Sequence, residues 1–117
     1  MALPEIEKIN NAKTGMEILT NNNGIAIKFS GGILICYGTV NFVSGASNMT
    51  SVTLPTSFLD TGYSISLQNI FSNSSAIIWS VAAQTKNSFN AYPKISSTLA
   101  TPDVNCSARF TAIGKWK

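Results

Sequence analysis

The segment from Cys106 to Trp116 constrains the fold more than any other part of the chain. Positions 106, 108, 110, 112, 114 and 116 hold Cys, Ala, Phe, Ala, Gly and Trp, whereas the positions between them hold Ser, Arg, Thr, Ile and Lys. An alternation with period two is typical of a β-strand that has one buried face and one solvent-facing face. We therefore expect this segment to form a strand that pairs inside a sheet.

From Ile25 onward the chain is predicted to consist of strands separated by turns. The turn signals are Thr20–Gly24 and Ser30–Gly32, because Asn and Gly tolerate the positive φ that turns require. Pro93 predicts that its strand is an edge strand or is interrupted, since proline cannot donate to a ladder. The predicted strands cover residues 25–29, 33–42, 63–71, 77–83, 88–95 and 106–116, together with a short strand through Val52 and Leu54 that Pro55 ends. So many short strands with almost no helix indicate an antiparallel β-sandwich or barrel.

The alternation also predicts which side chains lie in the interior or in a subunit interface. These are Leu34, Cys36, Val40, Phe42, Ile65, Leu67, Trp79, Val81, Phe89, Phe110 and Ala112. Five further apolar residues lie opposite the predicted core faces, and so much exposed apolar surface is unusual in a monomer. These five are Ile33, Ile35, Tyr37, Ile78 and Ile113. A homotrimer would bury them and protect the strand edges.

Composition supports a sheet protein and argues against several partners. Ser, Thr and Asn make up 38 of the 117 residues, whereas only 11% are charged. Neutral polar side chains therefore coat the outer faces, and they favour strands and turns over helices. The eight basic residues are scattered along the chain, which gives little support to nucleic-acid binding. The longest apolar run, Ile33–Tyr37, is too short to cross a bilayer.

The residue types needed for most catalysis are missing. The chain has no histidine, which excludes Ser-His and Cys-His nucleophiles and His-based metal sites. Of its five carboxylates, only Asp60 and Asp103 lie outside the N-terminal segment, both in predicted loops, where turn or capping roles are usual. Cys36 and Cys106 fall on apolar faces and are interpreted as small buried thiols, with a disulfide left open if their strands are neighbours. We expect a non-enzymatic protein without cofactor or metal.

The first 24 residues differ from the rest of the chain. Their loosely helical apolar spacing and Pro4 predict a short helical or extended stalk-like segment over 1–24, followed by a β-domain over 25–117. The N-terminus lacks the basic and apolar regions of a secretory signal. We therefore expect synthesis in the cytoplasm and, at most, release without a signal peptide.

Four segments of the sequence resemble, in their order along the chain, the tip domains of bacteriophage and prophage tail fibres. The first is IAIKFSGGILICYG, residues 25–38, with a strand, a Gly-rich turn and a long apolar strand. The others are VTLPTSF at 52–58, the strand at 63–67 and the closing segment from Phe110 to Trp116. Such tips usually end a long fibre, and the sequence leaves open whether a shaft is attached here.

The resemblance implies a homotrimeric tip, part of the virion tail fibre, that binds a bacterial surface polysaccharide or outer-surface protein. A second role stays open, that of a structural virion decoration or a cap that trimerises the fibre. For a glycan reader, a ring face and neighbouring amides are the useful groups. Asn90, Tyr92 and Lys94 share one polar strand face and are the predicted carbohydrate-binding residues. The competing interpretation is that Tyr92 packs on a neighbouring strand or subunit.

Overall fold

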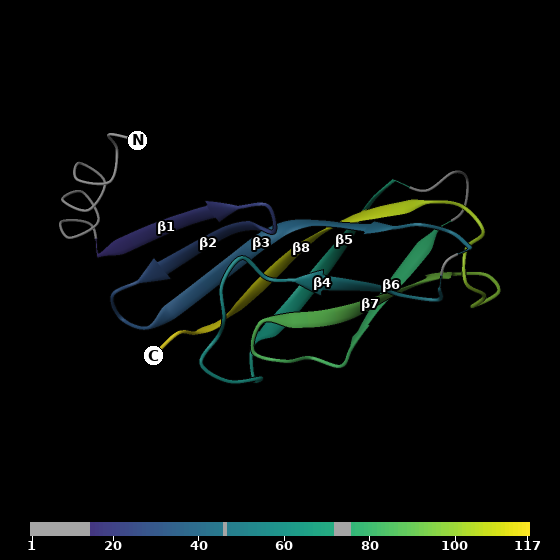
Figure 1. Ribbon diagram of the computed structural model, residues 1–117. Coiled ribbons are helices and arrows are strands. Elements are labelled where there is room, and N and C mark those ends of the chain that lie inside the picture. The colour runs from purple at the N-terminus through teal and green to yellow at the C-terminus, as the bar shows by residue number, and fades with distance from the viewer. Residues whose placement is uncertain (1–14, 46, 72–75) are drawn as a thin grey trace.

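The computed structural model describes residues 15–45, 47–71 and 76–117, and these form two antiparallel sheets (Figure 1). The strands are β1 (Met16–Asn21), β2 (Gly24–Phe29), β3 (Ile33–Phe42), β4 (Thr50–Thr53), β5 (Ser64–Phe71), β6 (Ile77–Ala82), β7 (Ser88–Ile95) and β8 (Cys106–Lys115). The five-stranded sheet has the order β1-β2-β3-β8-β5, and the three-stranded sheet has the order β4-β7-β6. The predicted antiparallel β-sandwich is confirmed, and the molecule is elongated, with extents of 51 × 29 × 20 Å.

The C-terminal strand β8 lies inside the five-stranded sheet, as its alternation predicted. It pairs with β3 along its whole length, from Ile33 opposite Lys115 to Phe42 opposite Cys106. On its other side it pairs with β5. Its even-numbered residues from 106 to 112 are buried, and Arg109, Thr111 and Ile113 are exposed. The strand with the clearest period-two pattern is therefore an interior strand of the larger sheet.

The core lies between the two sheets and contains the residues that the alternation predicted. Phe89 of the smaller sheet meets Phe110 of the larger one edge to face, with ring centroids 5.6 Å apart. Seven predicted core residues are buried, namely Leu34, Cys36, Val40, Phe42, Phe89, Phe110 and Ala112. The other four, Ile65, Leu67, Trp79 and Val81, are partly buried and pack against this cluster.

The expectation that Pro93 marks an edge strand or an interruption was wrong, because β7 is continuous and lies at the centre of its sheet. The short strand β4 pairs with β7 only as far as Ala91, whereas β6 pairs with it as far as Ile95. Pro93 thus lies beyond the end of β4. On the β4 side of β7, no residue pairs with position 93. Proline has no backbone N–H to donate, and it is tolerated there because no partner needs that hydrogen bond.

Part of the expected N-terminal segment belongs to the larger sheet. Within residues 1–24, Met16–Asn21 form β1, which pairs with β2 across the turn at Asn22 and Asn23. A Cβ at Gly24 would collide with the carbonyl oxygen of Tyr37, and the φ of Gly24 is +132°, so this turn requires glycine. Residues 1–14 lie outside the described residues. The helical part of the segment and the division at residue 24 therefore stay predictions.

Both cysteines are free and buried, as interpreted from the sequence. Cys36 lies opposite Ala112, and Cys106 lies opposite Phe42, six residues further along β3. That separation is about 20 Å along the strands, so the disulfide left open by the sequence does not form. Burial raises the pKa of the Cys36 thiol to about 11 and also raises the pKa of Cys106. Both thiols therefore behave as core residues.

Candidate functional site

The three predicted carbohydrate-binding residues share the outer face of the three-stranded sheet. Asn90, Tyr92 and Lys94 alternate along β7 with the buried Phe89, Ala91 and Pro93. Each of the three polar side chains is half-buried. The structure therefore places them in one row, on the central strand of the smaller sheet, with their partners on β4 and β6 beside them.

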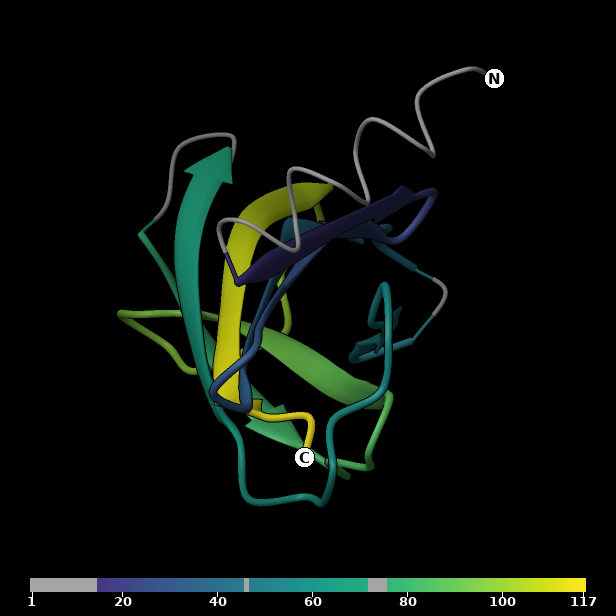
Figure 2. The ribbon, with the colours of Figure 1, turned by 90° about the vertical axis from the view of Figure 1, so that its left-hand side faces the viewer.

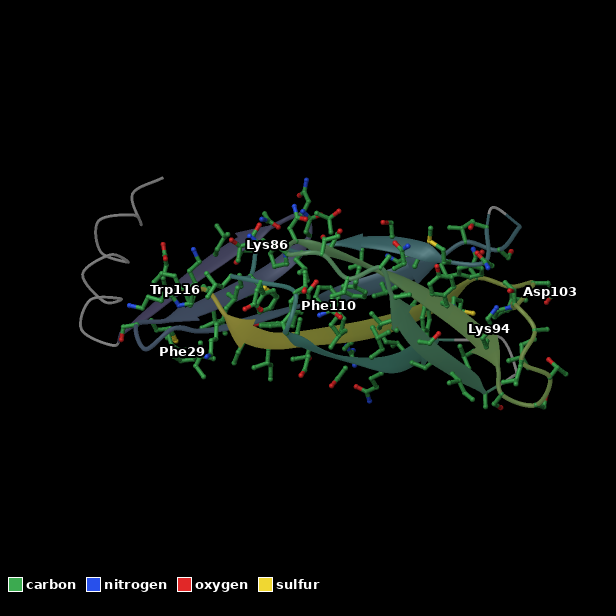
Figure 3. The ribbon with its side chains drawn as sticks, turned by 90° about the horizontal axis from the view of Figure 1, so that it is seen from below. Phe29, Lys86, Lys94, Asp103, Phe110 and Trp116 are labelled. Carbon is green, nitrogen blue, oxygen red and sulfur yellow. The ribbon has the colours of Figure 1, made fainter. Side chains whose placement is uncertain are left out.

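We call Asn90, Tyr92 and Lys94 the β7 row, and two hydrogen bonds fix its ends. The Ser51 hydroxyl on β4 donates to Oδ1 of Asn90 at 3.3 Å. The Lys94 ammonium donates to Oγ1 of Thr101 at 3.1 Å, which directs Lys94 toward the loop that precedes β8. Lys94 and Asp103 lie at the same end of the molecule in Figure 3. The row thus runs from the edge strand β4 toward one end of the sandwich.

A polar cleft adjoins the β7 row at Ser51. Its volume is about 490 Å³. It is lined by the turn between β1 and β2, by the second half of β3 and by β4: Asn21, Asn22, Asn23, Gly24, Gly38, Thr39, Val40, Asn41, Thr50, Ser51, Val52 and Thr53. Because Ser51 lines the cleft and also bonds to Asn90, the cleft and the row form one continuous polar surface.

The cleft exists because β2 is shorter than β3. The last residue of β3 that pairs with β2 is Tyr37, opposite Ile25, and β3 continues to Phe42. The turn at Asn22 and Asn23 closes this end of β2 and is fixed by Asn21, whose Nδ2 donates to the Pro55 carbonyl at 2.8 Å. The backbone N–H of Asn23 donates to Oδ1 of Asn21 at 2.9 Å.

Sequence reasoning missed this cleft. The turn predicted over Thr20–Gly24 is present at Asn22 and Asn23, but pairing between strands decides what the turn faces. The signal present in the sequence was the difference in length between the predicted strands at 25–29 and 33–42. A long strand next to a short one leaves an unpaired edge, and that edge is where the cleft lies.

The outer face of the five-stranded sheet carries a row of isoleucines. Ile18, Ile27, Ile35 and Ile113 lie opposite one another on β1, β2, β3 and β8. Ile18 and Ile113 are 42% and 48% exposed, and the neighbouring Ile33 and Tyr37 are also exposed. We call this the isoleucine face. On β2, the buried residue is the small Ala26, whereas the larger Ile25 and Ile27 point outward.

Ile78 lies opposite the core, as the sequence predicted, but it does not belong to the isoleucine face. It lies on β6, opposite Lys94, and so on the outer face of the three-stranded sheet, beside the β7 row. It is 50% exposed. The apolar residues opposite the core therefore form two separate surfaces, one on each side of the sandwich.

One of the two loop carboxylates holds a turn. Oδ1 of Asp60 accepts the backbone N–H of Gly62 at 2.8 Å, which is the turn role expected for a loop acid. Within residues 15–45, 47–71 and 76–117, no group of three or more His, Cys, Asp or Glu side chains is close enough to hold a metal ion. The same residues contain no helix of the length and hydropathy needed to span a bilayer.

Trp116 closes the opposite end of the sandwich from Lys94 (Figure 3). Its indole Nε1–H donates to the Phe29 carbonyl at 2.8 Å, and its backbone N–H donates to the Gly32 carbonyl at 2.9 Å. The ammonium groups of Lys28 and Lys117 lie 5.3 and 4.9 Å from the ring centroid. These contacts fix the end of β8 to the turn between β2 and β3, which is a structural role.

The fold is similar to that of solved R-type pyocin tail-fibre structures. The C-terminal region of the P. aeruginosa R2 pyocin fibre matches with a TM-score of 0.58 and 12% identity, over 91% of this chain and 28% of that one. That of the R1 pyocin fibre matches with a TM-score of 0.58 and 15% identity, over 90% of this chain and 30% of that one. This chain thus spans less than a third of either fibre fragment.

A shorter fragment matches nearly end to end. The N-truncated R1-type pyocin tail fibre has a TM-score of 0.57 and 15% identity, over 92% of this chain and 93% of that one. At such identities the likeness shows a shared fold. The resemblance to tail-fibre tips is thereby confirmed at the level of structure. No protein-family model and no curated protein matches the chain.

Proposed function

We propose that this chain is the receptor-binding tip of a phage or prophage tail fibre, a component of the virion tail that has no enzymatic activity. The observation that carries the proposal is the shared fold with R-type pyocin fibre C-terminal regions, which extends over about nine-tenths of the chain. The four sequence segments that resemble tail-fibre tips, and their order along the chain, support the same conclusion. The scarcity of carboxylates and the lack of histidine agree with a binding role rather than a hydrolytic one.

The receptor is a bacterial cell-surface glycan, and the β7 row is the first contact. Tyr92 offers an aromatic ring to the C–H face of a sugar, and the amide of Asn90 offers both donors and an acceptor. Lys94 adds a positive charge at the same face. The hydrogen bonds from Ser51 and to Thr101 hold the two ends of the row in place, which lowers the entropic cost of binding.

The tip works as a homotrimer. The isoleucine face supplies the apolar surface that three copies bury, and it lies on the opposite side of the sandwich from the β7 row. The glycan-binding rows consequently stay free on the outside. Three weak sites on one rigid particle raise the apparent affinity roughly 10²-fold or more when they engage together.

Binding of the purified protein to a panel of bacteria and to a glycan array tests the proposal. We expect binding to cells and to at least one surface glycan, reduced by Tyr92→Ala and retained by Tyr92→Phe, which keeps the ring. A wild-type trimer that binds no cell and no glycan would favour the structural decoration or trimerisation cap instead. Loss of the trimer in Tyr92→Ala would show that Tyr92 is a packing residue.

A further inference from the structure

We infer that the cleft between β3 and β4 is a second binding site and that it takes a neutral saccharide unit. The inference rests on the proposed function, because it says where on the tip another part of the receptor glycan is held. The cleft lies beside the β7 row, with Ser51 at their common border. A chain of sugars bound at Tyr92 can therefore continue into the cleft.

The free edge of β3 supplies backbone groups to the cleft. Residues 38–42 pair with β8 on one side, whereas on the other side β2 has already ended. Among the described residues, no loop or turn backbone group bonds to this edge. An extended strand presents N–H and C=O groups to each side, so the edge offers donors and acceptors together. Sugar hydroxyls, which both donate and accept, match such an edge.

The side chains that line the cleft offer mainly amide and hydroxyl groups. Val40 and Val52 belong to the core cluster, at 1% and 7% exposure, and so offer almost no apolar surface to a ligand. Asn22, Thr39 and Asn41 are among the exposed amide and hydroxyl residues at its rim. These amides and hydroxyls both donate and accept hydrogen bonds, and therefore match the hydroxyls of a sugar.

The ligand is neutral because the lining holds no ionisable side chain. A carboxylate or phosphate bound here would lose hydration without gaining a charged partner, which is costly. The volume of about 490 Å³ lies within the range of small-ligand sites, roughly 300–1,000 Å³. The cleft therefore fits one or two neutral sugar units.

A peptide strand fits the cleft less well than a sugar does. A strand inserted between β3 and β4 needs about 4.8 Å on each side, or roughly 9–10 Å in all. Some Cα atoms of β3 and β4 lie within 8 Å of each other, and a strand paired to both edges would not fit where they do. The turn also closes one end, since a Cβ at Gly38 would lie 2.9 Å from the Asn23 carbonyl oxygen.

Titration of the ¹⁵N-labelled full chain with glucose, galactose, rhamnose and N-acetylglucosamine tests the site, with glucuronate as the charged comparison. We expect at least one neutral sugar to shift the backbone amide signals of residues 38–41 and 50–53, and glucuronate to shift them less. Thr39→Trp fills the cleft and should weaken binding about tenfold or more. The matched control is Thr61→Trp, at an exposed threonine of the loop between β4 and β5, outside both the cleft and the isoleucine face.

A milder pair of changes guards against a folding defect in Thr39→Trp. The double variant Asn41→Ala/Thr53→Ala removes two exposed rim side chains and should weaken the same shifts while the dispersion of the spectrum is kept. The site is wrong if no neutral sugar shifts these amides, or if all shifts map to Tyr92 and Lys94. It is also wrong if a peptide of alternating Thr and Val shifts them where sugars do not, since the occupant is then a protein.

Cell binding separates this inference from the proposed function. A Thr39→Trp protein that binds bacteria as strongly as the wild type overturns the cleft site and leaves the receptor-binding function standing. A wild-type protein that binds no bacterium, yet whose cleft amides respond to neutral sugars, overturns the function and leaves the cleft as a saccharide site.

Discussion

At the scale of single residues, the sandwich depends on a few positions where a side chain would not fit or a polar group would be unpaired. Gly114 on β8 faces the stacked rings of Phe58 and Tyr63, whose centroids are 4.1 Å apart. The Tyr63 hydroxyl donates toward the carbonyls of Thr85 and Ser88, at 2.6 and 3.1 Å. This cluster ties the loop before β7 to the larger sheet.

Gly114→Ala should destabilise the protein by about 1–3 kcal/mol, the usual cost of overpacking. An added Cβ would lie 2.6 Å from Cβ of Tyr63 and 2.9 Å from Cδ1 of Phe58, so the stacked rings must move. Urea denaturation measures the effect. The control is Gly31→Ala, where an added Cβ meets no atom within 4 Å, and equal losses in the two variants would refute the packing argument.

Stability should also fall in alkaline solution. Burial raises the pKa of Cys36 to about 11 and that of Tyr63 to about 12, above their ordinary values of 9.0 and 10.0. A raised folded-state pKa gives a stabilisation that is complete below the unfolded pKa and is lost as pH rises through the folded one. We therefore expect the free energy of unfolding to decline between pH 9 and 12.

Cys36→Ala isolates the contribution of the thiol to this decline. The variant should lose the part of the pH dependence that starts near the unfolded pKa of 9.0, and keep the part that belongs to Tyr63. Denaturation curves recorded at a series of pH values in wild type and variant make the comparison. An unchanged pH dependence in Cys36→Ala would show that the Cys36 thiol does not cause it.

At the scale of strands, the two sheets are joined by a side-chain hydrogen bond as well as by the core. The indole N–H of Trp79 on β6 donates to Oδ1 of Asn69 on β5 at 3.0 Å. Asn69 lies where the register of β5 against β8 shifts, between Asn69 and Phe71. A bulge commonly redirects a side chain, and here Asn69 bonds across to the other sheet.

Asn69→Ala should cost about 1–3 kcal/mol, because the partly buried indole N–H of Trp79 loses its partner. Combining it with Trp79→Phe, which removes the N–H, should cost less than the sum of the two single changes. Urea denaturation of the four proteins gives this coupling energy. Strict additivity would mean that the bond contributes nothing.

Strands were predictable from the sequence to different degrees. Period-two alternation located β3, β5 and β8, because each has one face on the core. The order of strands in each sheet was not predictable, since it depends on pairing between distant segments. Pro93 shows the effect, because whether it sits at an edge depends on how far the separate strand β4 reaches.

The candidate site was likewise predictable only in part. The sequence placed Asn90, Tyr92 and Lys94 on one face, because residues two apart on a strand share a face. The same alternation put Ile78 and Ile113 together as residues opposite the core. Alternation does not reveal that β6 and β8 belong to different sheets. The cleft was missed since it is made by three segments that meet only in the folded chain.

At the scale of the whole molecule, the two outer faces of the sandwich have different roles in the proposed assembly. Ile113 on the isoleucine face and Ile78 beside the β7 row are almost equally exposed, at 48% and 50%. Ile113 is on β8 and Ile78 is on β6, and these strands belong to different sheets. The two strands can be followed by colour in Figure 2, and the same change on each compares the two faces directly.

Ile113→Glu should dissociate the trimer, whereas Ile78→Glu should leave it intact. A charge at Ile113 would be buried without a partner in the interface, and one at Ile78 would stay in solvent. Light scattering should give three times the chain mass of 12.5 kDa for the wild type and for Ile78→Glu. A wild-type particle of 12.5 kDa would contradict the assembly itself, and a trimeric Ile113→Glu would place the interface elsewhere.

The way the chain enters and leaves the sandwich has a mechanical consequence. Gly15 and Trp116 both bond to the turn between β2 and β3, at one end of the long axis, and Lys94 lies at the other (Figure 3). A pull between these ends runs along the strands, across hydrogen bonds that lie perpendicular to them. Such a load shears all the bonds of a strand pair together instead of opening them one by one. The domain is therefore built to resist tension applied along its length.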